Sequence, residues 1–183
     1  MRIITGTARG FRLRTLEGRD TRPTTDRVKE ALFSVLQFDI PGRRVLDLFA
    51  GSGQLGIEAL SRGAAGCTFV DQNAEAVAVV KENVAGARLS SGTQIICQDA
   101  LTFLAQSKEQ YQLVFLDPPY QSGLLLKALE LLPVHLAPGA IIACETDERT
   151  TLPDAVGTCV LDRTYRYGKI CVWVYRYKEE ESL

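Results

Sequence analysis

The four residues Asp117-Pro118-Pro119-Tyr120 are the group in this sequence with the clearest chemistry. They follow the apolar run 113–116, which has the composition of a buried strand. Proline has no backbone N–H, so two in succession leave carbonyl oxygens that only accept hydrogen bonds. An exocyclic NH₂ group suits such a corner, giving one N–H to Asp117 and one to the Pro118 carbonyl, while Tyr120 offers a flat face for the ring. We therefore predict that Asp117, Pro118 and Tyr120 are catalytic; the alternative is that they merely end a strand.

A glycine-rich loop, Asp47-Leu-Phe-Ala-Gly51-Ser-Gly53-Gln-Leu-Gly56, follows another predicted strand and precedes a predicted helix. Glycines let a backbone turn sharply and approach a ligand, and a helix N-terminus presents unpaired N–H groups. The spacing is also that of a dinucleotide fingerprint, with Asp71 twenty residues after Gly51. The loop indicates a nucleoside-like ligand without saying which one. The candidate ligand-binding residues here are Asp47, Phe49, Ala50, Gly51 and Gly53.

Three aspartates near this loop each have two interpretations. Asp71, at the end of the second predicted strand, either binds a ribose, which we favour, or caps the next helix, a task open also to Asn73. Asp99 either caps a helix or recognises an adenine. Asp47 either contacts the ligand, which we favour, or braces the amides of the loop.

The two motifs together suggest a reaction. The lone pair of a nucleobase amine is delocalised into its ring, and two acceptors would turn it toward an electrophile beside the glycine loop. A nucleoside that carries an electrophile suggests a methyl sulfonium. Transfer to a held amine needs neither metal nor histidine. No metal site is expected, because the five cysteines lie far apart without a CxxC pair, and the single histidine, His135, is expected in a loop.

Charge is concentrated at the start of the chain. The 183 residues carry a net charge of −1, but residues 1–29 hold eight Lys and Arg against three acidic residues. Arginine suits phosphate oxygens and stacks on bases, so nucleic-acid binding is one interpretation and a solvated arm the other. The candidate RNA-binding residues are Arg2, Arg9, Arg12, Arg22 and Thr24.

The elements that must position these groups follow an α/β pattern. Strands are predicted at 45–49, 67–70, 94–97, 113–116 and 140–144, with helices at 54–61, 74–87, 100–106 and 124–132. This alternation is typical of a mostly parallel sheet covered on both faces. Residues 159–165 and 170–177 predict an antiparallel C-terminal hairpin, which gives seven strands. Residues 1–40 are expected to form a basic β-hairpin and a helix, and residues 41–183 one compact unit.

The motifs also carry a resemblance. Residues 47–53 with 117–120 resemble the class I S-adenosylmethionine-dependent amino-methyltransferases that act on nucleic-acid bases, which have a Rossmann-like fold. Arg2-Ile-Ile, Gly10 and residues 22–27, 30–33 and 56–62 resemble the bacterial 16S ribosomal RNA guanine-N2 methyltransferases of the RsmD type.

This resemblance implies roles for the candidate residues. Asp71 would bind the ribose of S-adenosylmethionine, Asp99 and Ala100 its adenine, and the glycine loop its methionine part. Asp117, Pro118 and Tyr120 would hold the target guanine. A DNA adenine-N6 methyltransferase and a non-catalytic or NAD-binding α/β domain are the alternatives. We expect a cytoplasmic monomer that acts on 16S ribosomal RNA, within a small-subunit particle and without metal or membrane.

Overall fold

A computed structural model of the protein describes residues 1–16, 25–120 and 122–178. Its helices are α1 (Thr25–Val35), α2 (Gln54–Ser61), α3 (Ala74–Gly86), α4 (Ala100–Gln106) and α5 (Leu124–Leu131), the last continued by the 3₁₀ helix η1 (Leu132–His135). Its strands are β1 (Arg44–Leu48), β2 (Gly66–Asp71), β3 (Thr93–Cys97), β4 (Tyr111–Leu116), β5 (Leu136–Asp147), β6 (Ala155–Val156), β7 (Cys159–Tyr167) and β8 (Ile170–Tyr177). The predicted helices and strands are present, with ends shifted by a few residues.

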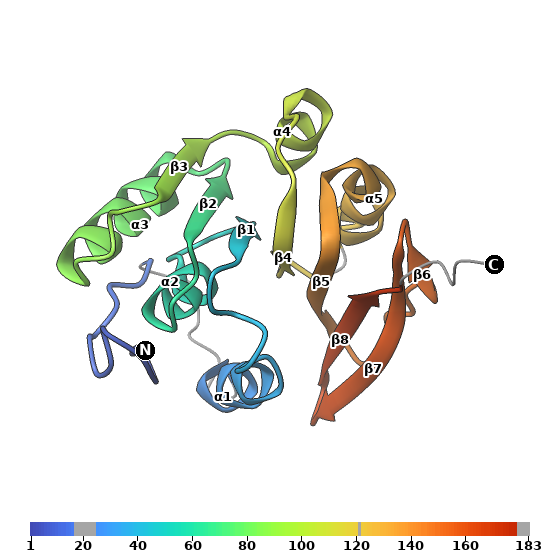
Figure 1. Cartoon of the computed structure of the whole chain (residues 1–183), viewed down its shortest axis with the longest axis horizontal. Helices are drawn as coiled ribbons and strands as arrows, with labels where there is room; N and C mark the ends of the chain where they lie inside the picture. The colour runs from blue at the N-terminus through green and yellow to red at the C-terminus, as the bar shows by residue number, and fades with distance from the viewer. Residues whose placement is uncertain (17–24, 121, 179–183) are drawn as a thin grey trace.

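All the strands join one sheet in the order β3-β2-β1-β4-β5-β8-β7-β6 (Figure 1). The first five strands pair in parallel, and the C-terminal strands pair antiparallel. The predicted Rossmann-like fold is confirmed, but the count of seven strands is wrong. The eighth strand, β6, has only two residues, too few to show a two-residue period in sequence.

Alternate side chains of the strands enter two cores. Val45 of β1 packs with α1, α2 and α3 on one face, whereas its neighbour Leu46 packs with α4 and α5 on the other. The central strands β1, β2 and β4 are largely buried because both of their faces are covered, whereas the edge strand β3 has only half-buried and exposed residues. Within the described ranges, the longest helix is α3 with 13 residues, and none is suited by length and apolarity to crossing a membrane.

The N-terminal segment forms only a minimal version of the expected hairpin. It folds back on itself through Ile3 N–H to the Phe11 carbonyl at 2.9 Å and Gly10 N–H to the Ile3 carbonyl at 2.8 Å. The only pairing of strand type between the described residues of this segment is an isolated bridge between Arg2 and Arg12. Two buried side chains, Ile3 and Leu13, belong to the same core as α1, α2 and α3. The segment is therefore packed onto the sheet domain rather than separate from it.

Candidate active site

The carboxyl ends of neighbouring strands bring the predicted site residues to one edge of the sheet. β1 leads into the glycine loop, β2 ends at Asp71 and β4 is followed by Asp117. Because β1 lies between β2 and β4 and pairs with both in parallel, the three chain segments leave the sheet on the same side.

The glycine loop turns back sharply after β1. The N–H groups of Phe49 and Ala50 both donate to the Val70 carbonyl, at 3.0 and 2.9 Å. Phe49 and Gly53 have positive φ angles of 78° and 79°, and Gly53 precedes α2 without a side-chain cap. The backbone at position 53 is left-handed, a conformation that is costly for residues with a side chain, so it favours glycine there. The loop therefore presents backbone groups at the N-terminus of α2.

Gly56 has a different purpose from the loop glycines. A Cβ atom at this position would lie 2.3 Å from Phe69 and 2.6 Å from the Cys67 sulfur. Only glycine allows α2 to pack this closely on β2. This third glycine of the motif therefore sets helix packing, not ligand contact.

Asp47 braces the loop, as the second of its two interpretations requires, and a contact with the ligand stays a prediction. Its side chain is 3% exposed, and Oδ2 accepts a hydrogen bond of 2.9 Å from the Gly56 N–H. Burial raises the pKa of Asp47 to about 7, against the opposing effect of the Gly56 hydrogen bond. A buried carboxylate occupied in this way leaves little surface for a ligand.

Asp71 joins the end of β2 to the glycine loop. Its Oδ2 accepts from Gly51 N–H and its Oδ1 from Asn73 N–H, both at 2.9 Å. The cap of α3 is Asn73, whose side chain accepts from Glu75 N–H at 2.9 Å. Asn73, and not Asp71, therefore caps the helix, and the contact of Asp71 with a ribose stays a prediction.

Asp99 caps α4. Its Oδ1 accepts from the Thr102 N–H at 2.8 Å and from the Thr102 hydroxyl at 2.9 Å, and these bonds lower the pKa of the carboxyl group. The carboxylate is nevertheless exposed, and Ala100 begins the helix as a buried residue. Recognition of an adenine at Asp99 and Ala100 stays a prediction.

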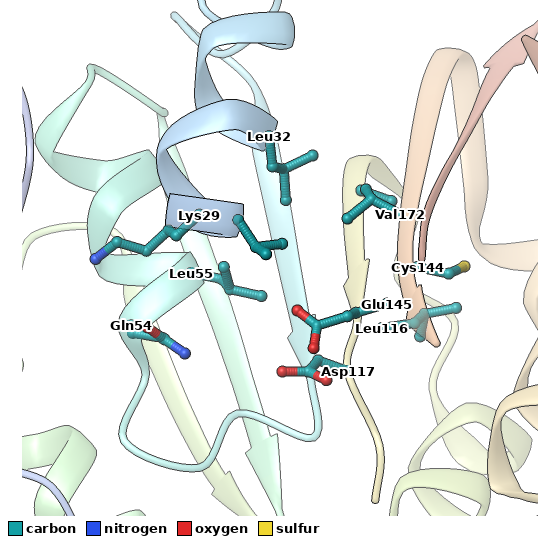
Figure 2. A pocket seen from close by; sticks show the side chains of 11 residues that line it. Lys29, Leu32, Gln54, Leu55, Leu116, Asp117, Cys144, Glu145 and Val172 are labelled. Atoms are coloured by element: carbon teal, nitrogen blue, oxygen red, sulfur yellow. The ribbon is translucent and has the colours of Figure 1, made fainter. Parts of the chain in front are cut away.

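A pocket lies beside Asp117 (Figure 2). Asp117 is half-buried and Pro118 is buried. The pocket is walled by apolar residues from five elements, with a few polar side chains among them. Its lining comprises Val28, Lys29 and Leu32 of α1, Gln54 and Leu55 of α2, Leu116 and Asp117, Ala143, Cys144 and Glu145 of β5, and Val172 of β8. Since Gln54 follows Gly53 directly, the glycine loop and the Asp117 corner meet at this pocket.

Glu145 is a pocket residue that sequence reasoning missed. The strand expected at 140–144 extends to Asp147, and Glu145 lies within it. The Tyr120 hydroxyl donates a 2.6 Å hydrogen bond to Glu145 Oε1. Tyr120 thus has a polar tie to β5 in addition to its ring face. A glutamate after the apolar run 140–144 looks like a strand end, so the sequence holds no signal for its role.

Two other polar side chains line the pocket. Lys29 is buried, and Figure 2 shows its ammonium group pointing away from Asp117 and Glu145. The ammonium group donates to the Arg2 carbonyl at 2.8 Å and lies 3.6 Å from Glu58; burial lowers the pKa of Lys29, against the attraction of Glu58. Gln54 Oε1 is a buried oxygen with no hydrogen-bond partner in the described part of the chain.

Glu58, in the second half of α2, holds the N-terminal segment in place. Its two carboxylate oxygens accept from the N–H groups of Ile4 and Thr5, at 2.8 and 3.1 Å. The Thr7 N–H donates to the Ser61 carbonyl at 2.8 Å. The helix that begins at the glycine loop therefore ends against the N-terminal segment.

The predicted RNA-binding residues are only partly placed. Arg2, Arg9 and Arg12 are exposed on the N-terminal segment. Arg22 and Thr24 lie outside the described residues. At the other end of the chain, Tyr165 and Tyr167 pack against the core of the sheet.

His135 is not a loop residue, which corrects the expectation. It ends η1 with 1% of its surface exposed, and its ring nitrogens lie 2.9 Å from the Glu109 carbonyl and 2.8 Å from the Leu104 carbonyl. It ties η1 to α4 and to the chain before β4.

Among the described residues, no group of three or more His, Cys, Asp or Glu is arranged to hold a metal ion.

Comparison with known proteins identifies the family. The family described as Conserved hypothetical protein 95 matches residues 1–176. Ribosomal RNA small subunit methyltransferase D of Escherichia coli is 36% identical over 178 residues, which cover 96% of this chain and 89% of that protein. The chain belongs to the RsmD family. The expectation drawn from the resemblance is confirmed at this level.

Solved structures agree with this membership. The structure of YhhF from Escherichia coli superposes on this RsmD-family chain with a TM-score of 0.86 and 36% identity, covering 98% of this chain and 99% of the other. The fold alone is shared with the Thermus thermophilus 16S rRNA N2 G1207 methyltransferase RsmC in complex with AdoMet and guanosine. That comparison has a TM-score of 0.72 and 18% identity, over 89% of this chain and 45% of the other.

Proposed function

We propose that this RsmD-family protein transfers a methyl group from S-adenosylmethionine to the exocyclic N2 amine of a guanine in small-subunit ribosomal RNA. The observation that carries the proposal is the pocket where Asp117 lies beside the residues that follow the glycine loop. The name of the Escherichia coli relative supports the class of reaction and the RNA. On this basis we propose that its substrate is the RNA of the small ribosomal subunit.

The residues around β1 and β2 fit S-adenosylmethionine. The α2 N-terminus has no cap from the side chain of Gly53, and its third N–H, that of Gly56, is bonded to Asp47, so the N–H groups of Gln54 and Leu55 would bind the methionine carboxylate. Asp71 is positioned at the loop by its bond from Gly51 and would accept the ribose hydroxyls. Asp99 and Ala100, at the start of α4, would contact the adenine. When bound, S-adenosylmethionine supplies an electrophilic methyl group and leaves as the neutral thioether.

The residues after β4 prepare the amine. Asp117 and the Pro118 carbonyl each accept one N–H of N2, which turns its lone pair out of conjugation with the ring. Transfer of the methyl group to N2 would leave this nitrogen with one proton too many, and Asp117 would be the acceptor for that proton. No step requires a metal ion. A base paired within a helix cannot enter, so the target guanine is flipped out or already unpaired, and the Tyr120 ring stacks on it.

The test is transfer of a labelled methyl group to small subunits and to naked 16S RNA from cells that lack this protein, with DNA as a second substrate. We expect label in the RNA, on a single guanine that mapping identifies. Label in DNA would favour the adenine-N6 alternative. Calorimetry should show binding of S-adenosylhomocysteine and none of NAD; the reverse would favour a dinucleotide-binding domain.

A further inference from the structure

Glu145 is a second carboxylate in the pocket of Asp117. In the parallel register of β4 and β5, Leu116 pairs with Cys144, so Asp117 and Glu145 are the next residues along the two adjacent strands. Both line the pocket, and Figure 2 shows both carboxylates directed into the space below α1 and beside Leu55. The pocket therefore presents two neighbouring groups that accept hydrogen bonds.

The position of Glu145 is fixed by the sheet and by Tyr120. β5 pairs with β4 on one side and with β8 on the other, where Glu145 pairs with Val172. The Tyr120 hydroxyl, 2.6 Å from Oε1, orients the carboxylate. A carboxylate has about four lone-pair sites on two oxygens, so it can accept more than one hydrogen bond. Glu145 is thus an oriented acceptor in a pocket with mostly apolar walls.

Nucleobases differ in the ring atom beside the exocyclic amine. In guanine, N1–H lies beside the N2 amine, so two donors are adjacent. In adenine and cytosine, the ring nitrogen beside the amine carries a lone pair and accepts. A carboxylate facing that ring atom therefore binds guanine and repels adenine and cytosine, and a pocket with few polar groups enlarges the difference.

We infer that Glu145 determines base specificity by accepting the N1–H hydrogen bond of the target guanine while Asp117 and the Pro118 carbonyl hold N2. The inference rests on the proposed function and explains why guanine would be its substrate. Tyr120 acts in this scheme as a positioning residue for Glu145, in addition to its stacking.

The experiment compares guanine with 2-aminopurine at the mapped target position of the RNA. 2-Aminopurine keeps the amine, but its N1 accepts. The wild-type protein should prefer guanine strongly. Glu145→Gln removes the charged acceptor of N1–H, so kcat/KM on guanine should fall roughly 10-fold to 100-fold. The new side-chain NH₂ can donate to N1 of 2-aminopurine, so the ratio of kcat/KM on guanine to that on 2-aminopurine should fall by at least about 10-fold. Binding of S-adenosylhomocysteine should not change.

Three further variants separate specificity from structure. Glu145→Ala removes the acceptor and should also reduce the preference for guanine. Tyr120→Phe keeps the carboxylate, so it should lower kcat/KM while guanine stays preferred. Glu130→Gln makes the same chemical change on the exposed side of α5 and should match the wild type.

The outcomes distinguish this inference from the proposed function. If the wild-type protein methylates guanine but both Glu145 variants keep its base preference, the inference is wrong and the function stands. Equal losses on both bases would likewise reduce Glu145 to a structural role. If the wild-type protein methylates no guanine in ribosomal RNA, the proposed function fails and the inference fails with it.

Discussion

The Gly51 N–H donates a 2.9 Å hydrogen bond to Asp71 Oδ2, which links the loop after β1 to the end of the neighbouring strand β2. A single carboxylate therefore both shapes the glycine loop and lies where a ribose is expected. Removing it should weaken cofactor binding even though the fold persists.

For Asp71→Ala we expect the affinity for S-adenosylhomocysteine to fall by about 1.5–3 kcal/mol, the range for hydrogen bonds to a charged group. Isothermal calorimetry measures the affinity, and circular dichroism checks the fold. Asp162→Ala, which removes an exposed carboxylate from β7, is the control. Unchanged affinity in Asp71→Ala would contradict the assignment of the ribose site.

Asp47 predicts a dependence of stability on pH. Its pKa is raised to about 7 in the folded protein, against about 3.9 when unfolded. Between these values the folded state binds the proton that the unfolded state releases, so the free energy of unfolding should fall as pH rises from about 4 to about 7. Asp47→Asn should flatten this fall by a few kcal/mol, on the scale of about 1.4 kcal/mol per pKa unit.

Denaturant unfolding at several pH values measures the effect of Asp47→Asn. Since asparagine still offers an oxygen to the Gly56 N–H, the variant should fold. A pH profile parallel to that of the wild type would mean that Asp47 is ionised in the folded protein.

Asp117 should be needed for turnover but not for cofactor binding. Asp117→Ala removes one of two acceptors for the amine, and loss of one such group typically costs about 100-fold to 1,000-fold in kcat. Asp117→Asn keeps an acceptor oxygen and should lose less. Methyl transfer to RNA and binding of S-adenosylhomocysteine are measured side by side; near-normal turnover in Asp117→Ala would remove its proposed role.

The exposed arginines of the N-terminal segment should make RNA binding sensitive to salt. Each phosphate contact contributes roughly 0.7–0.9 to the slope of log affinity against log salt concentration. The double variant Arg9→Ala, Arg12→Ala should therefore reduce the slope by roughly 1 to 2. Lys108→Ala, between α4 and β4, should leave the slope unchanged. If the double variant keeps the wild-type slope, these arginines do not contact phosphate.

The sequence was sufficient where local pattern decides structure. The apolar strands, the helix after Gly53 and the corner at Asp117 follow from composition and spacing, so the sheet and the edge at which the candidate residues meet could be predicted. The features that depend on tertiary packing could not be predicted in this way. Glu145 joins a strand because β8 pairs beside it, and Asp47 turns inward because α2 packs closely enough for Gly56 to reach it.

Helix α2 has the glycine loop at one end and, through Glu58 and Ser61, the backbone of Ile4, Thr5 and Thr7 at the other. At about 1.5 Å per residue, the eight residues of α2 form a helix only about 12 Å long. The N-terminal segment cannot move relative to the sheet without either breaking these hydrogen bonds or moving α2 with it. The proposed RNA-binding segment and the proposed site for S-adenosylmethionine are therefore joined by one short helix, so a displacement of the first should be transmitted to the second.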